Sequence, residues 1–425
     1  MKISAGIIIR FLIILFAAIT VIASFHYSHI SGGSDLRNRV VAARLLGKGY
    51  SPYFHKWNPA DGERLADPND FPARLVNGNT ATPAVLYVFY PLTFLPYPDI
   101  RFIWTVFQIL AAIVVVRIML KRYEGSSPLQ AAAIVLFGLL FSDYWLMHIE
   151  RGQVQILFLL FFAIAFYFYT GKLKSAEFFS GFTGGLFIFF RPFALLFCLG
   201  FFLHGKRSWI KGWATGVITG LLIFLAPNTS VWKDYYKAME EYSNACMNSA
   251  HEIRNAIHYP LPTVIEGAGN LTMNQNFDIT CMPAMYGIIQ KLGIPYSPVL
   301  SYVSCGIILL ILSLFFYRNR SRSAPVHLFL FGFLTYKILE LGMLGWRSPY
   351  SLILWIFPLF LIVQQIQKRS VQMLILLMSL LFLHNFPFYF HYQTFIGESV
   401  LLFFVGYFAF TTSRIKTPEP VWTES

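Results

Sequence analysis

The stretch that decides the fold covers residues 6–25 and reads GIIIRFLIILFAAITVIASF. It contains one charged residue, Arg10, and it has the length of about 20 apolar residues that a helix needs to cross a bilayer. A secretory signal peptide would also be apolar, but residues 22–25 (IASF) make a poor small-residue cleavage site. The sequence therefore favours an uncleaved first transmembrane helix over a signal peptide.

The composition extends this conclusion to the whole chain. Of the 425 residues, 56% are hydrophobic and 12% are charged, and 44 are phenylalanine. That balance excludes a soluble globular protein and predicts a polytopic membrane protein. The 33 Lys and Arg exceed the 20 Asp and Glu and give a formal net charge of +13. Because no nucleic-acid-binding motif is present, we interpret this charge as membrane topology and contact with anionic lipid headgroups.

Further apolar runs follow the first along the chain. They lie at about 83–97, 100–117, 129–147, 154–170, 176–190, 193–204, 209–226, 297–317, 326–344, 350–366, 371–388 and 395–412. Two polar stretches interrupt them, at 26–82 and 228–296. The sequence predicts one integral membrane domain over residues 1–425 with two elaborated loops.

Basic residues in the short connections set the expected orientation, because cytoplasmic loops are enriched in Lys and Arg. These residues are Lys121, Arg122, Lys172, Lys174, Lys206, Arg207, Lys211, Arg318, Arg320, Arg322, Lys368, Arg369, Arg414 and Lys416, with Lys2 and Arg10 at the N-terminus. Both termini are then cytoplasmic and both long loops are extracytoplasmic. Such a topology needs an even number of crossings, whereas the apolar runs add up to an odd number.

Two interpretations restore an even number. The segment 83–97, interrupted by three prolines, fails to span the membrane, or residues 176–204 form one helix kinked at Arg191-Pro192. The basic residues favour the first, because the second would export Lys121 and Arg122. Either way, the expected fold is an all-α polytopic bundle of about 12 transmembrane helices with two extracytoplasmic loops.

The first loop, 26–82, begins with Ser34-Asp35-Leu36-Arg37-Asn38-Arg39. Apolar residues at 36, 40, 43 and 47 have helical spacing, with Arg37 and Arg44 on another face, which predicts a juxtamembrane amphipathic helix on the membrane surface. Asp35 and Arg39 are four residues apart, close enough to pair. Asp35 is either a catalytic acid at the mouth of the first helix or an ordinary acid at a helix start.

Several kinds of chemistry lack support in the sequence. There is no HExxH, no paired-cysteine motif, no phosphate-binding P-loop and no dinucleotide fingerprint, so we expect no cofactor and predict no metal ligands, while metal dependence itself stays open. Cys198 and Cys305 lie in apolar runs and are expected to be inert. Cys246 and Cys281 both lie in or beside the second loop, 228–296, and would be able to pair there.

The remaining candidates are polar residues at the predicted extracytoplasmic ends of helices, where charges usually line a site. They are Asp35, Arg37, Arg39, Glu150, Arg151, Gln153, Arg191, Asn274, Gln275 and Arg347. Glu150 and Arg151 are equally well read as a helix-end pair, and Arg347 as an interfacial residue beside Trp346. Arg191 is either a site residue or an anchor at the membrane surface.

The order of short motifs resembles that of a known family. After the acid come Gly49-Tyr50-Ser51-Pro52-Tyr53, Pro83 opening an apolar segment, Gly152-Gln153-Val154-Gln155 opening a helix, Phe190-Arg191-Pro192, and Asn274-Gln275. This set resembles glycosyltransferase family 87, whose members have the GT-C fold and include bacterial polyprenyl-phosphate-mannose-dependent mannosyltransferases. The chain departs from the family pattern at Gln155, where Asn is usual, at Arg191, where Lys is usual, and after Arg347, where no His accompanies Ser348-Pro349.

The resemblance implies a GT-C-like bundle in a bacterial inner membrane and a hexose, mannose-like, supplied by a polyprenyl-phosphate donor on the extracytoplasmic face. It implies that Asp35 is the general base for an acceptor that is a lipid or a glycan. Arg39, Arg151, Gln153, Arg191, Asn274, Gln275 and Arg347 are the expected substrate-binding residues. Two other classes stay open: a lipid-linked glycan flippase or other transporter, and an O-antigen polymerase or ligase.

Overall fold

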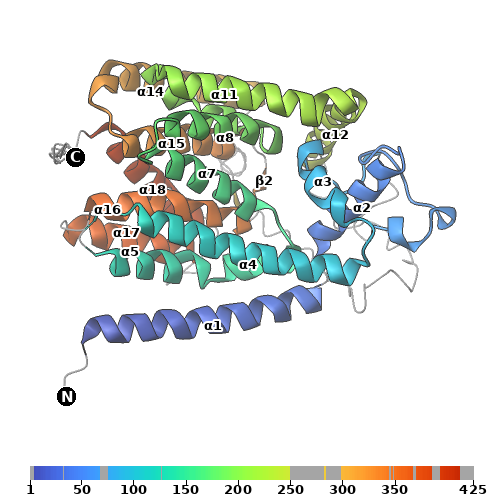
Figure 1. Cartoon of the computed structure of the whole chain (residues 1–425), viewed down its shortest axis with the longest axis horizontal. Coiled ribbons are helices and arrows are strands. Elements are labelled where there is room, and N and C mark those ends of the chain that lie inside the picture. Colours follow the sequence, from blue (N-terminus) through green and yellow to red (C-terminus); the bar gives the residue numbers. More distant parts are fainter. Residues whose placement is uncertain are drawn as a thin grey trace.

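The computed structural model of the chain describes residues 4–31, 33–67, 75–125, 127–248, 282–283, 298–343, 346–347, 349–366, 370–384 and 393–411. These residues are almost entirely helical (Figure 1). The helices are α1 (Ala5–Ser31), α2 (Ser34–Gly47), α3 (Pro83–Phe89), α4 (Tyr97–Lys121), α5 (Pro128–Val135), α6 (Asp143–Arg151), α7 (Gln155–Tyr169), α8 (Ala176–Phe190), α9 (Ala194–Phe197), α10 (Leu199–His204), α11 (Arg207–Gly220), α12 (Thr229–Asn248), α14 (Pro298–Asn319), α15 (Pro325–Met343), α16 (Ile356–Ile366), α17 (Ser370–Leu383) and α18 (Gln393–Phe410).

Shorter elements connect these helices. The 3₁₀ turns are η1 (Pro59–Asp61), η2 (Glu63–Leu65), η3 (Tyr90–Leu92), η6 (Ala226–Asn228), η8 (Arg320–Arg322) and η9 (Pro349–Trp355), and two π-helical turns are η4 (Leu136–Leu140) and η5 (Leu221–Leu225). Two short strands, β1 (Met282–Pro283) and β2 (Trp346–Arg347), pair antiparallel, with Met282 opposite Arg347. The expected all-α class is confirmed apart from this pair.

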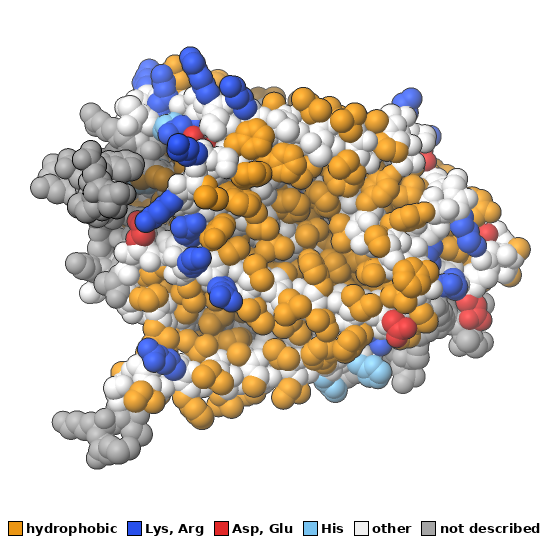
Figure 2. Space-filling model, viewed as in Figure 1, with side chains coloured by type: hydrophobic (Ala, Val, Ile, Leu, Met, Phe, Trp, Pro, Cys, Tyr) orange, Lys and Arg blue, Asp and Glu red, His pale blue; other side chains and the backbone are white. Residues whose placement is uncertain are grey.

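Within the described residues, 6 helical segments are long and apolar enough to cross a membrane, or up to 7 if the α5–α6 pair, bent by 54°, counts as one span. Five shorter apolar helices of 10–17 residues accompany them, among them 155–169 and 176–190. In Figure 2 apolar side chains cover the middle of the molecule, while Lys and Arg gather at the end where α1 begins. A broad apolar belt beside a basic end is the surface expected of an integral membrane protein.

The segment 83–97 is too short to cross a bilayer. Its α3 and η3 turns cover 83–92 before α4 begins, a rise of about 15 Å, which is half the hydrocarbon thickness of about 30 Å. Residues 176–204 are not one kinked helix. The chain reverses after α8, and α10 ends where Lys206 forms an ion pair of 3.2 Å with Glu177 at the start of α8.

Helices α8 and α11 run parallel to each other at very close range. Gly181 faces Trp209, and Gly185, one turn later, faces Trp213, so the contacts advance in the same direction along both helices. A Cβ on any of these glycines, or on Gly212, would overlap the backbone of the partner helix. Small residues permit such close helix approach in membranes, and this packing fixes the end of α8, where Arg191 lies.

Replacing Gly212 by Ala is therefore expected to destabilise the fold by about 1–3 kcal/mol, because its methyl group would overlap the Phe178 carbonyl. The matched control is Gly306→Ala in α14, where nothing lies within 4 Å of an added Cβ. That control should be neutral or slightly stabilising, since Ala is the better helix former. Thermal unfolding of both variants in detergent checks this, and equal melting temperatures would contradict the close packing of α8 on α11.

Helix α2 exists where the sequence predicts it, but it does not lie on a surface. Val40 and Ala43 are fully buried, and Arg37 and Arg44 are buried as well, at 1% and 6% exposure. The prediction that this helix lies on the membrane surface is wrong. The two arginines are buried because backbone carbonyls of neighbouring loops accept their hydrogen bonds. Arg37 donates to the Ala66 carbonyl at 3.3 Å, and Arg44 to other carbonyls of the same region. Figure 1 shows α2 and α3 at the end of the molecule opposite the start of α1.

Candidate active site

Asp35 lies in the first turn of α2, just after Gly33, whose positive φ of 67° turns the chain from α1 into this helix. Its side chain is 22% exposed. The carboxylate oxygen Oδ2 accepts a hydrogen bond from the Gln153 amide nitrogen and lies 3.8 Å from Nη1 of Arg151. The Asp35 carboxylate, in the first turn of a helix, therefore also lies beside a cation and an amide of a turn that is distant in sequence.

The Gln153 side chain joins Asp35 to Arg39. Its nitrogen Nε2 donates to Asp35, and its oxygen Oε1 accepts from Nη2 of Arg39 at 2.7 Å. Within the described residues, the expected direct pair between Asp35 and Arg39 is replaced by this amide bridge. Burial lowers the pKa of the Arg39 guanidinium, and the nearby Asp35 carboxylate opposes that shift.

The backbone conformation of Gly152 explains why a glycine precedes Gln153 in the turn between α6 and α7. It ends α6 in the left-handed conformation with φ 63°, where glycine carries no steric cost. An added Cβ would lie 2.5 Å from the Cβ of Leu36 in α2. Its carbonyl accepts from Arg39 Nη1 at 3.2 Å and from Trp104 Nε1 at 3.1 Å.

Helix α4 supports this turn through residues that the sequence analysis missed. Trp104 donates to the Gly152 carbonyl, and Gln108 Nε2 donates to the Gln153 carbonyl at 2.9 Å. Gln108 also contacts Nδ1 of the buried His148 at 3.2 Å. A Gln inside an apolar run was the available signal, because buried amides require partners.

Arg191 lies between α8 and α9 at the same end of the bundle. Its Nε donates to the Tyr336 hydroxyl at 3.2 Å, its Nη2 pairs with Glu340 Oε1 at 3.1 Å, and its guanidinium lies 5.4 Å from the centre of the Phe158 ring. Phe158 belongs to α7, five residues after Gln153, which is about 8 Å along a helix axis. Asp35 and Arg191 therefore approach the same end of α7.

The other motifs that resemble the family meet near Arg191. The Tyr53 hydroxyl donates to the Ala81 carbonyl at 2.7 Å, and the Thr82 hydroxyl donates to the Phe190 carbonyl at 3.4 Å. The ring of Tyr235 in α12 lies 5.7 Å from that of Tyr53. Motifs that are weak individually in the sequence thus occupy one region of the structure.

The remaining expected site residues are placed only in part. Asn274, Gln275 and Cys281 lie outside the described residues, as does the side chain of Cys246. Arg347 is described through its backbone, which pairs with Met282 in the β1–β2 ladder. Cys198 and Cys305 are buried free cysteines.

A second set of charged residues, absent from the sequence-based list, lies inside the bundle. Lys337 and Glu340 of α15 and Glu398 of α18 have side chains exposed by 0%, 1% and 0%. Lys337 Nζ lies 2.6 Å from Glu340 Oε2 and 3.5 Å from Glu398 Oε1. Three charges within apolar runs were the available signal, since charge in a membrane segment is costly and marks function.

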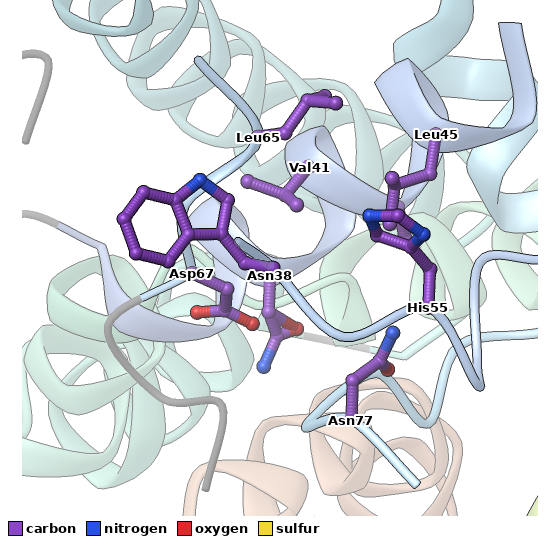
Figure 3. Close-up of a pocket in the computed structure, with 9 residues that line it drawn as sticks. Asn38, Val41, Leu45, His55, Leu65, Asp67 and Asn77 are labelled. Atoms are coloured by element: carbon purple, nitrogen blue, oxygen red, sulfur yellow. The ribbon is translucent and has the colours of Figure 1, made fainter. Parts of the chain in front are cut away.

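A small cavity borders α2 beside the Asp35 turn (Figure 3). It measures about 10 Å³, and Asn38, His55, Asp67 and Asn77 contribute its polar lining. That volume holds about one water molecule. The cavity shows how closely His55, Leu65, Asp67 and Asn77 pack over α2, and a sugar does not fit in it. Within the described part of the chain, no three His, Cys, Asp or Glu side chains are grouped to hold a metal ion.

Comparison with known protein families shows to which family the chain belongs. The model of glycosyltransferase family 87 matches residues 80–344, more than half of the 425 residues. The chain belongs to glycosyltransferase family 87. It is therefore a membrane glycosyltransferase by family, acting on a donor and an acceptor. Comparison with curated proteins and with solved structures found no match.

The family match covers some of the candidate residues and leaves others out. Arg151, Gln153, Arg191, Asn274 and Gln275 lie within residues 80–344. Asp35, Arg39 and Arg347 lie outside this range, so Asp35 is a candidate because of its place in the sequence and its contacts with Gln153 and Arg151. In this family-87 chain, the arrangement offers a carboxylate that can accept a proton and arginines that can stabilise an anion.

Proposed function

We propose that this protein transfers a mannose-like hexose from a polyprenyl-phosphate donor to a lipid or glycan acceptor, with inversion at the anomeric carbon. One observation carries the proposal: the Asp35 carboxylate is held between Gln153 and Arg151 at the end of α7 that Arg191 also approaches. A base and a cation are thereby presented to one region, as direct displacement of a lipid phosphate requires.

Asp35 is the proposed general base. Its Oδ2 is engaged by Gln153 and Arg151, while Oδ1 has no partner among the described residues. In the proposed step Asp35 takes the proton of the acceptor hydroxyl as that oxygen bonds to the anomeric carbon. The bond from this carbon to the phosphate oxygen breaks, and the lipid phosphate leaves with the electron pair. One carboxylate and one displacement give inversion.

The leaving phosphate gains negative charge, which Arg191 is proposed to stabilise. Its Nε and Nη2 are engaged by Tyr336 and Glu340, whereas its Nη1 has no partner among the described residues and the side chain is 23% exposed. Arg151, beside Asp35, is the second proposed cation. Arg39, Gln153, Asn274, Gln275 and Arg347 complete the proposed substrate-binding set.

The proposed orientation places this site on the extracytoplasmic face of a bacterial inner membrane, with both termini in the cytoplasm. The support is the position of the basic residues. Lys121 and Arg122 lie over the Tyr167 ring at the far end of α7, at 5.6 and 4.5 Å, and Lys206 lies at the start of α8. Lys and Arg favour the cytoplasmic side, so the Asp35 end faces outward.

A lipid-linked glycan transporter is the second candidate. The observation in its favour is the buried charge set of Lys337, Glu340 and Glu398, because charges inside the bundle often mark a translocation path. Membership of a glycosyltransferase family favours the transferase.

The test is a transfer assay with purified protein and a panel of radiolabelled polyprenyl-phosphate hexoses. We expect label to move from one donor to a new lipid or glycan, with polyprenyl phosphate released in equal amount. Label that crosses a proteoliposome membrane without a new glycosidic bond would support the transporter instead. A product carrying many repeats would support a polymerase.

A further inference from the structure

Lys337 is a described side chain whose position the proposed chemistry leaves unexplained. It is fully buried in α15 and cannot reach a ligand at the exposed edge of Arg191. A buried cation carries a large desolvation cost unless it is paired. Its partners are the two carboxylates Glu340 and Glu398, and through Glu340 it is connected to Arg191.

Among the described residues, two cations share the Glu340 carboxylate. Its Oε1 lies 3.1 Å from Arg191 Nη2, and its Oε2 lies 2.6 Å from Lys337 Nζ. An unshared carboxylate tends to bind a guanidinium with both oxygens in a bidentate pair. Here Lys337 occupies the second oxygen, so Arg191 is bound to Glu340 through one nitrogen.

Because Lys337 shares the Glu340 carboxylate, one nitrogen of the Arg191 guanidinium is left for another ligand. Its Nε binds the Tyr336 hydroxyl, and Nη1 has no partner within the described residues. Arg191 is also the accessible member of the set, at 23% exposure against 1% for Glu340. The guanidinium is therefore oriented by fixed partners and still presents one donor group outward.

Glu398 holds Lys337 from the other side. Its Oε1 lies 3.5 Å from Lys337 Nζ and accepts a hydrogen bond of 2.9 Å from Trp355 Nε1. Arg191, Glu340, Lys337 and Glu398 together carry no net charge. Pairing of opposite charges in this way offsets part of the desolvation cost of the three buried members.

We propose that Lys337 is a positioning residue that keeps Arg191 singly paired with Glu340, so that Arg191 Nη1 is available to the phosphate of a lipid donor. This inference rests on the proposed function, in which Arg191 binds that phosphate. Without Lys337, Glu340 would bind Arg191 through both oxygens, and the donor phosphate would have to compete with an internal carboxylate.

The experiment measures binding of a short-chain polyprenyl phosphate to the purified full-length protein in detergent, beside thermal unfolding. The decisive variant is K337M/E398Q, which removes one charge of each sign and keeps the set neutral. We expect it to unfold near the wild-type temperature and to bind the lipid phosphate roughly 10-fold or more weakly, the effect of losing one charged hydrogen bond. The K337M variant alone should lose both stability and affinity.

Two further variants complete the test. R191Q/E340Q, also neutral, should lose affinity because the phosphate-binding cation is gone. E340Q should bind the lipid phosphate at least as tightly as wild type, because an amide does not hold the guanidinium as an ion pair. If no Lys337 variant folds, E340Q still tests the inference, because weaker binding of the lipid phosphate by E340Q would overturn it.

Other outcomes separate this inference from the proposed function. A stable K337M/E398Q protein with wild-type affinity would overturn the role of Lys337, as would wild-type affinity in R191Q/E340Q. Lipid-phosphate binding that follows the expected pattern in a protein that transfers no sugar would refute the proposed transferase and leave the Lys337 inference standing.

Discussion

Replacing Asp35 by Asn is expected to lower sugar transfer by at least about 100-fold, the usual contribution of a general base. Asn keeps the size of the side chain and an oxygen that can accept from Gln153, so α2 should stay in place. It cannot take a proton from the acceptor hydroxyl. The measurement is the transfer rate of the purified variant with the donor that wild type uses, beside its melting temperature.

Asp99→Asn is the matched control, because Asp99 is an exposed acid in the first turn of α4 at the same end of the molecule. It should transfer sugar at the wild-type rate. A well-folded Asp35→Asn protein with wild-type activity would exclude Asp35 as the base, whatever its effect on substrate affinity.

Gly152→Ala is expected to have the second large effect, on both stability and activity. The new side chain would hold an unfavourable left-handed conformation, costing about 1–2 kcal/mol. Its Cβ would also lie 2.5 Å from the Leu36 Cβ, and such overlap costs about 1–3 kcal/mol more. Because Leu36 adjoins Asp35, relief of the overlap would move α2 and displace the carboxylate.

Gly205→Ala separates these two causes. Gly205 ends α10 in the same left-handed conformation, at φ 75°, and nothing lies within 4 Å of an added Cβ. It should lose only the conformational part of the stability and keep its transfer rate. Equal losses in the two variants would show that the contact between Gly152 and α2 is unimportant.

The sequence allowed the class of the protein, its family and the position of α2 to be predicted, because these depend on local patterns. Apolar runs of membrane length identify helices, and Gly152-Gln153 is a short motif whose glycine has a local conformational reason. Asp35 was chosen as a candidate from its position after the first helix. The structure adds that Gln153 and Arg151, more than a hundred residues away, are the groups that contact it.

The surroundings of α2 depend on contacts distant in sequence and were not predictable. Arg37 and Arg44, seven residues apart, have the spacing of a solvated face. In the structure they are buried because carbonyls at Ala66 and Leu95 accept their hydrogen bonds. No local rule indicates that a loop 20 to 50 residues later will supply such acceptors.

The number of membrane-spanning helices was not predictable from apolar runs, for a different reason. A run of apolar residues shows that a segment is buried or faces lipid, but not how far it travels across the membrane. The apolar pattern of residues 176–204 is compatible with one kinked helix or with two segments, and the basic residues favoured two. The order of glycine contacts between α8 and α11 shows that the chain reverses between these helices. Lys337 and Glu340 were not predicted because they lie within an apolar run, whereas the candidate residues were those at helix ends.

The shortness of α7 and α8 has a consequence for the membrane itself. Each has 15 residues, a rise of about 22 Å, and they share a turn at the basic end. A hydrocarbon core of about 30 Å would extend roughly 8 Å beyond their other ends, where Gln153 and Arg191 lie. The bilayer would then have to thin locally, leaving a depression in the leaflet at that end. A long-chain lipid can slide sideways into such a depression with its tail still in the membrane, whereas a water-soluble sugar carrier would have to descend into it.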